Sequence, residues 1–178
     1  MIDKTKKNSK KKLSGIEKAG EDLFNFAVDR KDIKTLMAHL PESADIKRVT
    51  VEYELQLLKI ISVGWGLSYY LENSPRKDAL SELYWSAVNQ FSRSLSETTE
   101  LMTGHEIDYF ETLKNRLDMY LNALNRKPDA PEAVSAIGPE FARVCGNAED
   151  VFTVMTGSRM FTLTIGGVKE YLEVIKLR

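Results

Sequence analysis

Apolar residues recur every three or four positions along most of the chain, and proline or glycine separates one such run from the next. On an α-helix this spacing gathers the apolar side chains on one face, so each run is typical of an amphipathic helix. A predicted N-cap, Asp129, followed by Pro131 and Glu132, marks one helix start. The pattern predicts helices over residues 14–29, 33–40, 46–72, 77–102, 105–126 and 131–156.

Two stretches are less regular. Within residues 131–156 the chain contains Gly138-Pro139, where we expect a kink or a break into two helices because proline removes a backbone hydrogen bond. Residues 160–167 alternate like a β-strand, whereas residues 161–175 step like a helix. Since no second strand is predicted to pair with this stretch, we expect a helix, weakened at Gly166-Gly167, with a strand as the alternative.

The predicted architecture is therefore an all-α, single-domain bundle of about six or seven helices over residues 13–178, preceded by a flexible basic arm, residues 1–12. The helix at 46–72 is expected near its centre. "LMTG" at 101–104 and "VMTG" at 154–157 each suggest a corner whose glycine ends a helix. Tyrosine-leucine pairs recur at offsets of 50 and 51 residues, starting at Tyr70, Tyr120 and Tyr171. These similarities favour three helical hairpins, unless the pairs arise by chance.

Composition is that of an ordinary soluble domain. The chain has 178 residues, with 43% hydrophobic and 29% charged residues. A domain of this length buries enough surface to be stable without disulfides or a structural metal. The longest apolar run, residues 57–71, contains Lys59 and is shorter than the ~20 residues of a membrane span. No secretory signal is recognisable, and the single cysteine, Cys145, is expected to be a buried, inert thiol. We expect a cytoplasmic protein without a membrane span.

Charge is unevenly distributed along the chain. Residues 1–12 contain six lysines and one aspartate, net +5, and the whole chain is −1, which leaves −6 for residues 13–178. This distribution argues against specific nucleic-acid binding, because phosphate recognition needs a basic face on the fold itself. The arm is interpreted as a solvated terminus, with weak contact to nucleic acid or acidic lipid as the alternative.

No catalytic constellation is found. Phosphate-binding loops, nucleophile elbows and paired Glu-x-x-His elements are absent from the sequence. His39 is expected to bond the last carbonyls of its helix. The weak metal candidates are His105, Glu106 and Glu100, in an acidic corner that also contains Glu97, Asp108 and Glu111. The favoured interpretation of that corner is structural, since acids in a first helical turn interact well with the helix dipole.

Aromatic residues concentrate in the central segments. Trp65, Tyr69, Tyr84 and Trp85 are the candidates for lining a small-ligand pocket, because tyrosine and tryptophan carry polar tips that seek partners when buried. The alternative is that they fill a core. In the same segment Gly64 and Gly66 cost roughly 1 kcal/mol each in a helix relative to alanine, and we interpret them as clearance for neighbouring backbones.

Two functions follow from these observations. The first is a non-enzymatic interaction or regulatory module that binds itself or another protein through an exposed apolar face. The second is a bundle that binds a small ligand or cofactor, whose identity is unknown, near Trp65, Tyr69 and Trp85.

Overall fold

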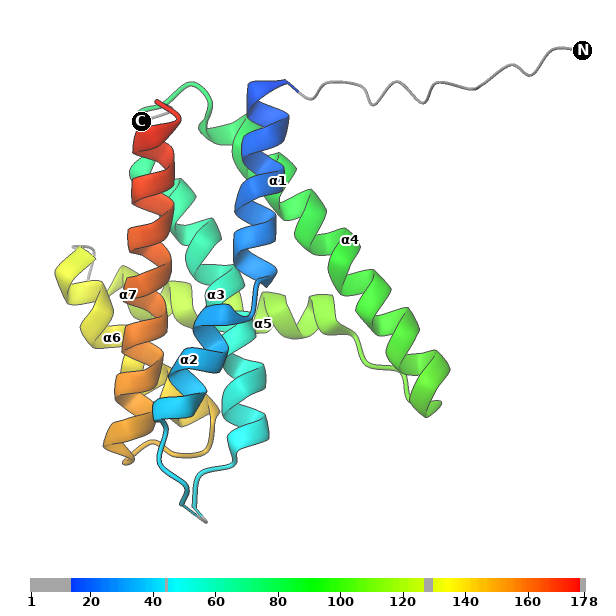
Figure 1. Ribbon diagram of the computed structural model, residues 1–178, viewed down its shortest axis with the longest axis vertical. Helices are drawn as coiled ribbons and strands as arrows, with labels where there is room; N and C mark the ends of the chain where they lie inside the picture. The colour runs from blue at the N-terminus through cyan, green and yellow to red at the C-terminus, as the bar shows by residue number, and fades with distance from the viewer. Residues whose placement is uncertain (1–13, 44, 127–129, 177–178) are drawn as a thin grey trace, which may run out of the picture.

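The computed structural model describes residues 14–43, 45–126 and 130–176. Within these residues the chain forms α-helices and no β-strand, which confirms the all-α prediction (Figure 1). The helices are α1 (Gly15–Val28), α2 (Lys31–His39), α3 (Arg48–Tyr70), α4 (Lys77–Thr103), α5 (Tyr109–Asn125), α6 (Ala130–Val144) and α7 (Val151–Val174). The predicted arm, residues 1–12, and the predicted cap Asp129 lie outside the described residues.

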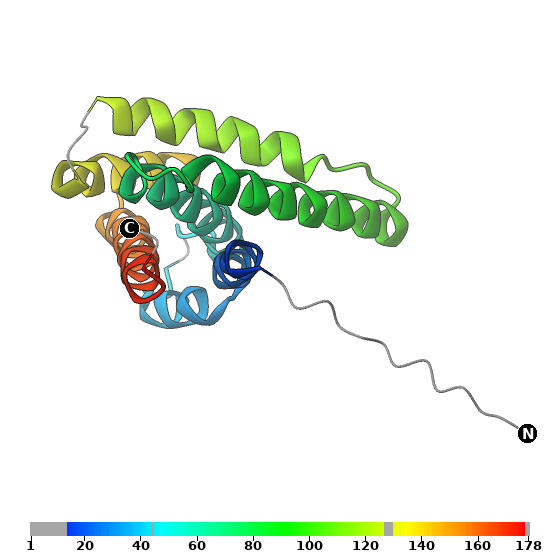
Figure 2. The same ribbon diagram turned by 90° about the horizontal axis from the view of Figure 1, so that it is seen from above.

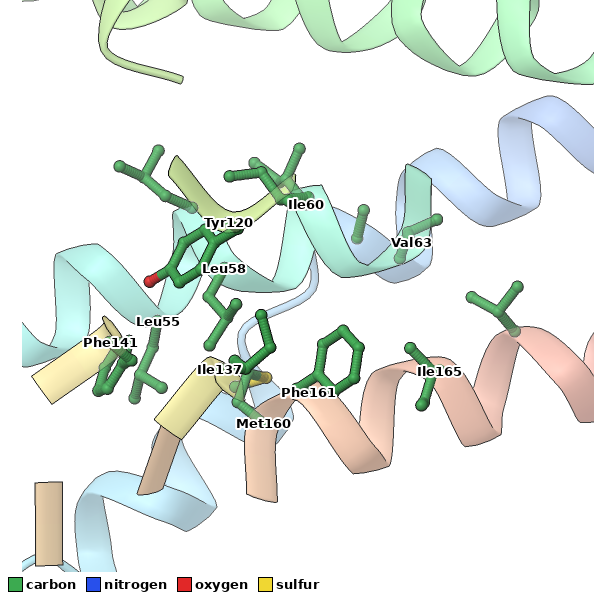
Figure 3. Packing of buried hydrophobic residues seen from close by; sticks show 14 of the residues in the cluster. Leu55, Leu58, Ile60, Val63, Tyr120, Ile137, Phe141, Met160, Phe161 and Ile165 are labelled. Atoms are coloured by element: carbon green, nitrogen blue, oxygen red, sulfur yellow. The ribbon is translucent and has the colours of Figure 1, made fainter. Parts of the chain in front are cut away.

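Helix α3 is the centre of the molecule and contacts each of the other described helices. Seen from above, α4 and α5 lie side by side along one flank, while α1, α2 and α7 lie on the other side of α3 (Figure 2). Figure 3 shows Leu58 of α3, Ile137 of α6 and Met160 of α7 meeting in the shared hydrophobic core. No described helix is both long enough and apolar enough to cross a membrane.

A kink or a break was predicted at Gly138-Pro139, and the break is wrong, because α6 continues through both residues. Gly138 packs so closely on α7 that an added Cβ would lie 2.8 Å from the Val154 carbonyl oxygen. This packing holds the helix together despite the proline. The chain instead turns at Gly146, whose φ of 76° is left-handed. There the Gly146 amide donates to the Arg143 carbonyl, and the Asn147 amide donates to the Ala142 carbonyl. This pair of hydrogen bonds is the Schellman motif that ends a helix.

The two predicted M-T-G corners have opposite outcomes. Gly104 ends α4 in the left-handed conformation, with φ of 69°, as predicted. The corner at 154–157 is wrong, because Gly157 lies inside α7 and faces Phe141 of α6, 2.6 Å from the position of an added Cβ. The second glycine therefore serves a close helix crossing, and the three-hairpin arrangement lacks its second corner.

Residues 160–167 lie inside α7, which confirms the preference for a helix over a strand there. Helix α7 runs without interruption through Gly166-Gly167. Gly167 lies close to the ring of Phe26, whereas an added Cβ at Gly166 would meet nothing within 4 Å. A contact within the chain therefore explains Gly167, whereas no contact within the chain explains Gly166.

The two glycines of α3 face different neighbours. An added Cβ at Gly64 would overlap the indole of Trp85 on α4, and one at Gly66 would lie 3.2 Å from Val168 Cγ1 on α7. Helices α4 and α7 thus approach α3 on separate faces. Gly64 has the tighter contact of the two.

Candidate functional site

The four aromatic candidates divide between two faces of α3. Trp65 stacks on Tyr69, with ring centroids 4.8 Å apart, and also contacts Phe161 of α7. Tyr84 is fully buried on the α4 side, where its hydroxyl donates to the Ile60 carbonyl at 2.7 Å. Burial also raises the pKa of Tyr84 well above its ordinary value. Its neighbour Trp85 covers Gly64.

Among these four, Tyr69 borders a surface hollow of about 690 Å³ at the end of the bundle, next to Arg76 and Lys176. The ring of Tyr84, by contrast, is enclosed in the core. The structure thus separates Tyr69 from Tyr84 and Trp85 instead of gathering all four around one cavity. A small ligand near Trp65 and Tyr69 stays a prediction.

The acidic corner forms the connection between α4 and α5. Asp108 is the N-cap of α5 and its carboxylate accepts the Glu111 backbone amide at 2.9 Å. Glu100, His105 and Glu106 are exposed. Over the described residues, no group of three or more histidine, cysteine, aspartate or glutamate side chains is arranged to hold a metal ion.

His39 and Cys145 have the environments expected of them. His39 Nδ1 donates to the Thr35 carbonyl in the last turn of α2, at 2.7 Å. Cys145 is buried, and burial together with the charge of Glu54 raises its thiol pKa from 9.0 to about 12. The thiol is therefore protonated at neutral pH and is a poor nucleophile.

An apolar groove of about 390 Å³ lies between α3, α4 and α5, a feature that the sequence did not indicate. Leu57 and Ile60 of α3 form its floor, and Phe91 and Leu95 of α4 form one wall. The rest of the lining is Val28, Arg30, Val49, Glu52, Tyr53, Gln56, Ser92, Tyr109 and Leu113. The groove is thus an apolar depression with charged residues at its edge, the usual composition of a binding site for an apolar side chain.

Beside the groove, the end of α4 and the start of α5 project from the body as a helical hairpin (Figure 1). We call residues 93–111 the tip. No residue from Arg93 to Asp108 is buried, and Leu101 and Met102 are 88% and 80% exposed. The Tyr109 amide donates to Ser96 Oγ and so joins the two helices. A helical end with so little core contact leaves its apolar residues available to a partner.

The tip is also acidic. It contains one positively charged residue, Arg93, and five acids, Glu97, Glu100, Glu106, Asp108 and Glu111, a net charge of −4 with histidine neutral. The Glu111 carboxylate, at the end of the tip, is paired with Lys114 of α5, which lies just outside the tip, at 3.2 Å. The remaining acids give the surface beside the groove a negative potential.

One ion pair with a buried carboxylate joins two of the helices that form the groove, α3 and α5. Glu54 of α3 is 3% exposed and accepts two bonds from Arg116 of α5, at 2.9 and 2.8 Å. The same bonds raise the pKa of Arg116. Next to Glu54, Tyr53 lines the groove and packs on Tyr109, with ring centroids 6.3 Å apart. Desolvation and the charge of Glu54 raise the pKa of Tyr53, so its hydroxyl remains neutral at physiological pH.

Comparisons with known proteins add no relative: no family model, curated protein or solved structure matches the chain.

Proposed function

We propose that the protein is a helical interaction module that binds a basic amphipathic helix of another protein in the groove between α3, α4 and α5. The observation that carries this proposal is the continuity of the groove with the tip. Leu95 lines the groove on α4, and Met102, seven residues later and therefore within about 20° of it on the helix, continues the same face and is 80% exposed. A bound helix would place successive apolar residues along such a surface.

The negative charge of the tip favours a partner helix that carries basic residues. With five acids against one arginine, the tip attracts lysine or arginine residues that flank the apolar face of a partner and repels acidic ones. An apolar surface alone would bind many helices. The proposed partner therefore combines an apolar face with a basic border, and we expect both proteins to meet in the cytoplasm, where a single reduced cysteine is usual.

Two synthetic peptides test the proposal. Both are helices of about 18 residues, five turns long, with the same leucine face; one has lysines on its polar face and the other has glutamates. Fluorescence anisotropy is measured with the full chain. We expect the lysine peptide to bind saturably and more weakly at high salt, and the glutamate peptide to bind at least about tenfold more weakly.

Variants locate the binding surface. Leu95 and Val49 both line the groove and are 38% and 83% exposed, so Leu95→Arg and Val49→Arg should fold while placing a charge in the site. Each is expected to abolish binding of the lysine peptide. Leu163→Arg, on the exposed face of α7, is the matched control and should bind normally. Equal binding of both peptides, or wild-type binding by both groove variants, would contradict the proposal.

A further inference from the structure

The outer face of α7 carries a second unpartnered surface, which is separate from the groove. Phe152, Met155 and Leu163 are 53%, 44% and 53% exposed, and Val174 is 72% exposed. At 100° per residue, these residues lie within a sector of the helix about 100° wide, together with Arg159, Gly166 and Glu170. We call this sector the α7 stripe. It points away from the core, and Figure 2 shows α7 at the edge of the molecule.

Gly166 lies within the α7 stripe and has no structural reason within the chain. It is exposed in the middle of a helix, and an added Cβ would meet nothing within 4 Å. A glycine there weakens the helix relative to alanine and gains no packing from this chain. The other glycines inside helices face a neighbour, such as Gly64 against Trp85 and Gly157 against Phe141. The one other helical glycine without a neighbour, Gly15, is the first residue of α1. Gly166 is accounted for if a side chain approaches it from another molecule.

We propose that the α7 stripe is a homodimer interface in which the α7 helices of two copies pack antiparallel. In an antiparallel pair related by a two-fold axis, residues equidistant from the axis lie opposite each other. An axis midway between Thr164 and Ile165 pairs Leu163 of one copy with Gly166 of the other. The leucine side chain then fills the space that the absent Cβ leaves open.

The same axis also brings opposite charges together. It pairs Arg159 with Glu170 and does so twice, once on each side of the axis. Neither residue has an ion-pair partner within the described part of the chain. A single position of the axis thus places Arg159 opposite Glu170 and also Leu163 opposite Gly166.

Apolar contacts extend from the same axis. Met155 of one copy lies opposite Val174 of the other, so exposed apolar residues at both ends of the contact are covered. Beside Met155, a groove of about 480 Å³ runs between α6 and α7 and is lined by Val134, Ser158 and Leu163 among others. A second copy of this chain therefore fits the α7 stripe in charge, shape and apolar character.

Charge reversal tests the register. The dimer dissociation constant is measured by sedimentation equilibrium of the full chain from about 1 μM to about 300 μM, the range suited to a small interface. We expect Arg159→Glu and Glu170→Arg each to raise the dissociation constant at least about tenfold, because each creates two like-charge contacts. The double variant with both changes should restore it. These exposed residues have no internal ion pair, so the fold should tolerate all three variants.

A glycine substitution provides a second measurement. Gly166→Ala is expected to raise the melting temperature of the dilute monomer, because alanine favours a helix, while it weakens the dimer. Leu95→Arg, in the groove, is the control that should leave dimerisation unchanged. A monomer at the highest concentration, single charge reversals without effect, or a double variant that fails to recover would each overturn the proposal. Peptide binding at the groove is measured separately, so either proposal can fail alone.

Discussion

Gly64 of α3 faces the Trp85 side chain of α4. An added Cβ there would overlap the Trp85 indole, whereas one at Gly66 would lie 3.2 Å from the Val168 Cγ1 atom. Val168 and its helix need to move only by a few tenths of an ångström to admit a methyl group. The Trp85 ring stands edge-on to Tyr84, with centroids 5.2 Å apart, and Tyr84 is fixed by its bond to Ile60. A methyl group at Gly64 therefore requires a larger displacement of its neighbour than one at Gly66.

We predict that Gly64→Ala destabilises the protein by about 2 kcal/mol, the usual cost of overpacking a core. Gly66→Ala is expected to be close to neutral, since the gain in helix propensity of roughly 1 kcal/mol offsets the tight contact. Urea unfolding followed by circular dichroism measures both. Gly166→Ala is the control, because its added methyl group meets no neighbour in the monomer and it therefore measures the gain in helix propensity alone. An increase in stability for Gly64→Ala would show that α4 does not need the clearance.

Among the elements, α6 shows how packing overrides local signals. Pro139 is exposed and lies in the interior of the helix, where it costs a backbone hydrogen bond. Gly138 meanwhile sits against Val154 of α7, so a break at this point would cost the close contact of the two helices. The helix ends instead at Gly146, where the left-handed φ of 76° needs no Cβ.

Alanine substitutions at Pro139 and Gly146 are expected to change the stability of the protein in opposite directions. Pro139→Ala should stabilise the protein by about 1 kcal/mol or more, because it restores an amide donor and removes a ring from the helix interior. Gly146→Ala should destabilise it by about 1 kcal/mol, because alanine disfavours the left-handed conformation. Thermal unfolding of the two variants under identical conditions compares them. Loss of stability in Pro139→Ala would mean that the proline ring supplies packing that outweighs its missing bond.

Sequence patterns predicted the helical class and most of the helices because spacing along one helix is a local property. The same patterns place the apolar residues of each helix on one face, but they do not predict that Phe91, Leu95 and Leu113 line an open groove. That outcome depends on how far α4 projects past α3, which no local spacing encodes. Likewise Gly138 and Gly157 were interpreted as a break and a corner, yet both serve the crossing of α6 and α7.

For the whole molecule, two ion pairs, each with a buried member on α3 and a partly exposed partner, link the central helix to both sides. Lys59 has a fully buried side chain and donates to Asp32 Oδ2 and the Asp29 carbonyl oxygen, both at 2.9 Å. On the other side Glu54 pairs with Arg116 of α5. Sequence reasoning treated Lys59 only as an interruption of an apolar run, because the partners are supplied by distant segments. Such pairs are costly to break by removing one partner, which favours a single arrangement of the helices.

The buried Cys145 thiol and the buried hydroxyls of Tyr84 and Tyr120 make the stability of the protein fall at alkaline pH. The folded Cys145 thiol has a pKa of about 12 against an ordinary value of 9.0, so above pH 9 the unfolded thiol loses its proton while the folded thiol keeps it. The unfolded state then binds fewer protons, and stability falls as pH rises from 9 toward 12. Tyr84 and Tyr120, whose pKa values burial raises above 10.0, add to the decline at higher pH.

We predict that the free energy of unfolding drops by about 1 kcal/mol more between pH 7.5 and pH 10 in the wild type than in Cys145→Ala. The variant lacks the thiol that ionises on unfolding, and it also loses a few contacts, which shift its stability equally at every pH. Urea unfolding at several pH values therefore compares slopes and not absolute stabilities. Parallel slopes for the two proteins would show that the Cys145 thiol reaches solvent in the folded state, and reaction of the native protein with a maleimide at pH 9 would then confirm its exposure.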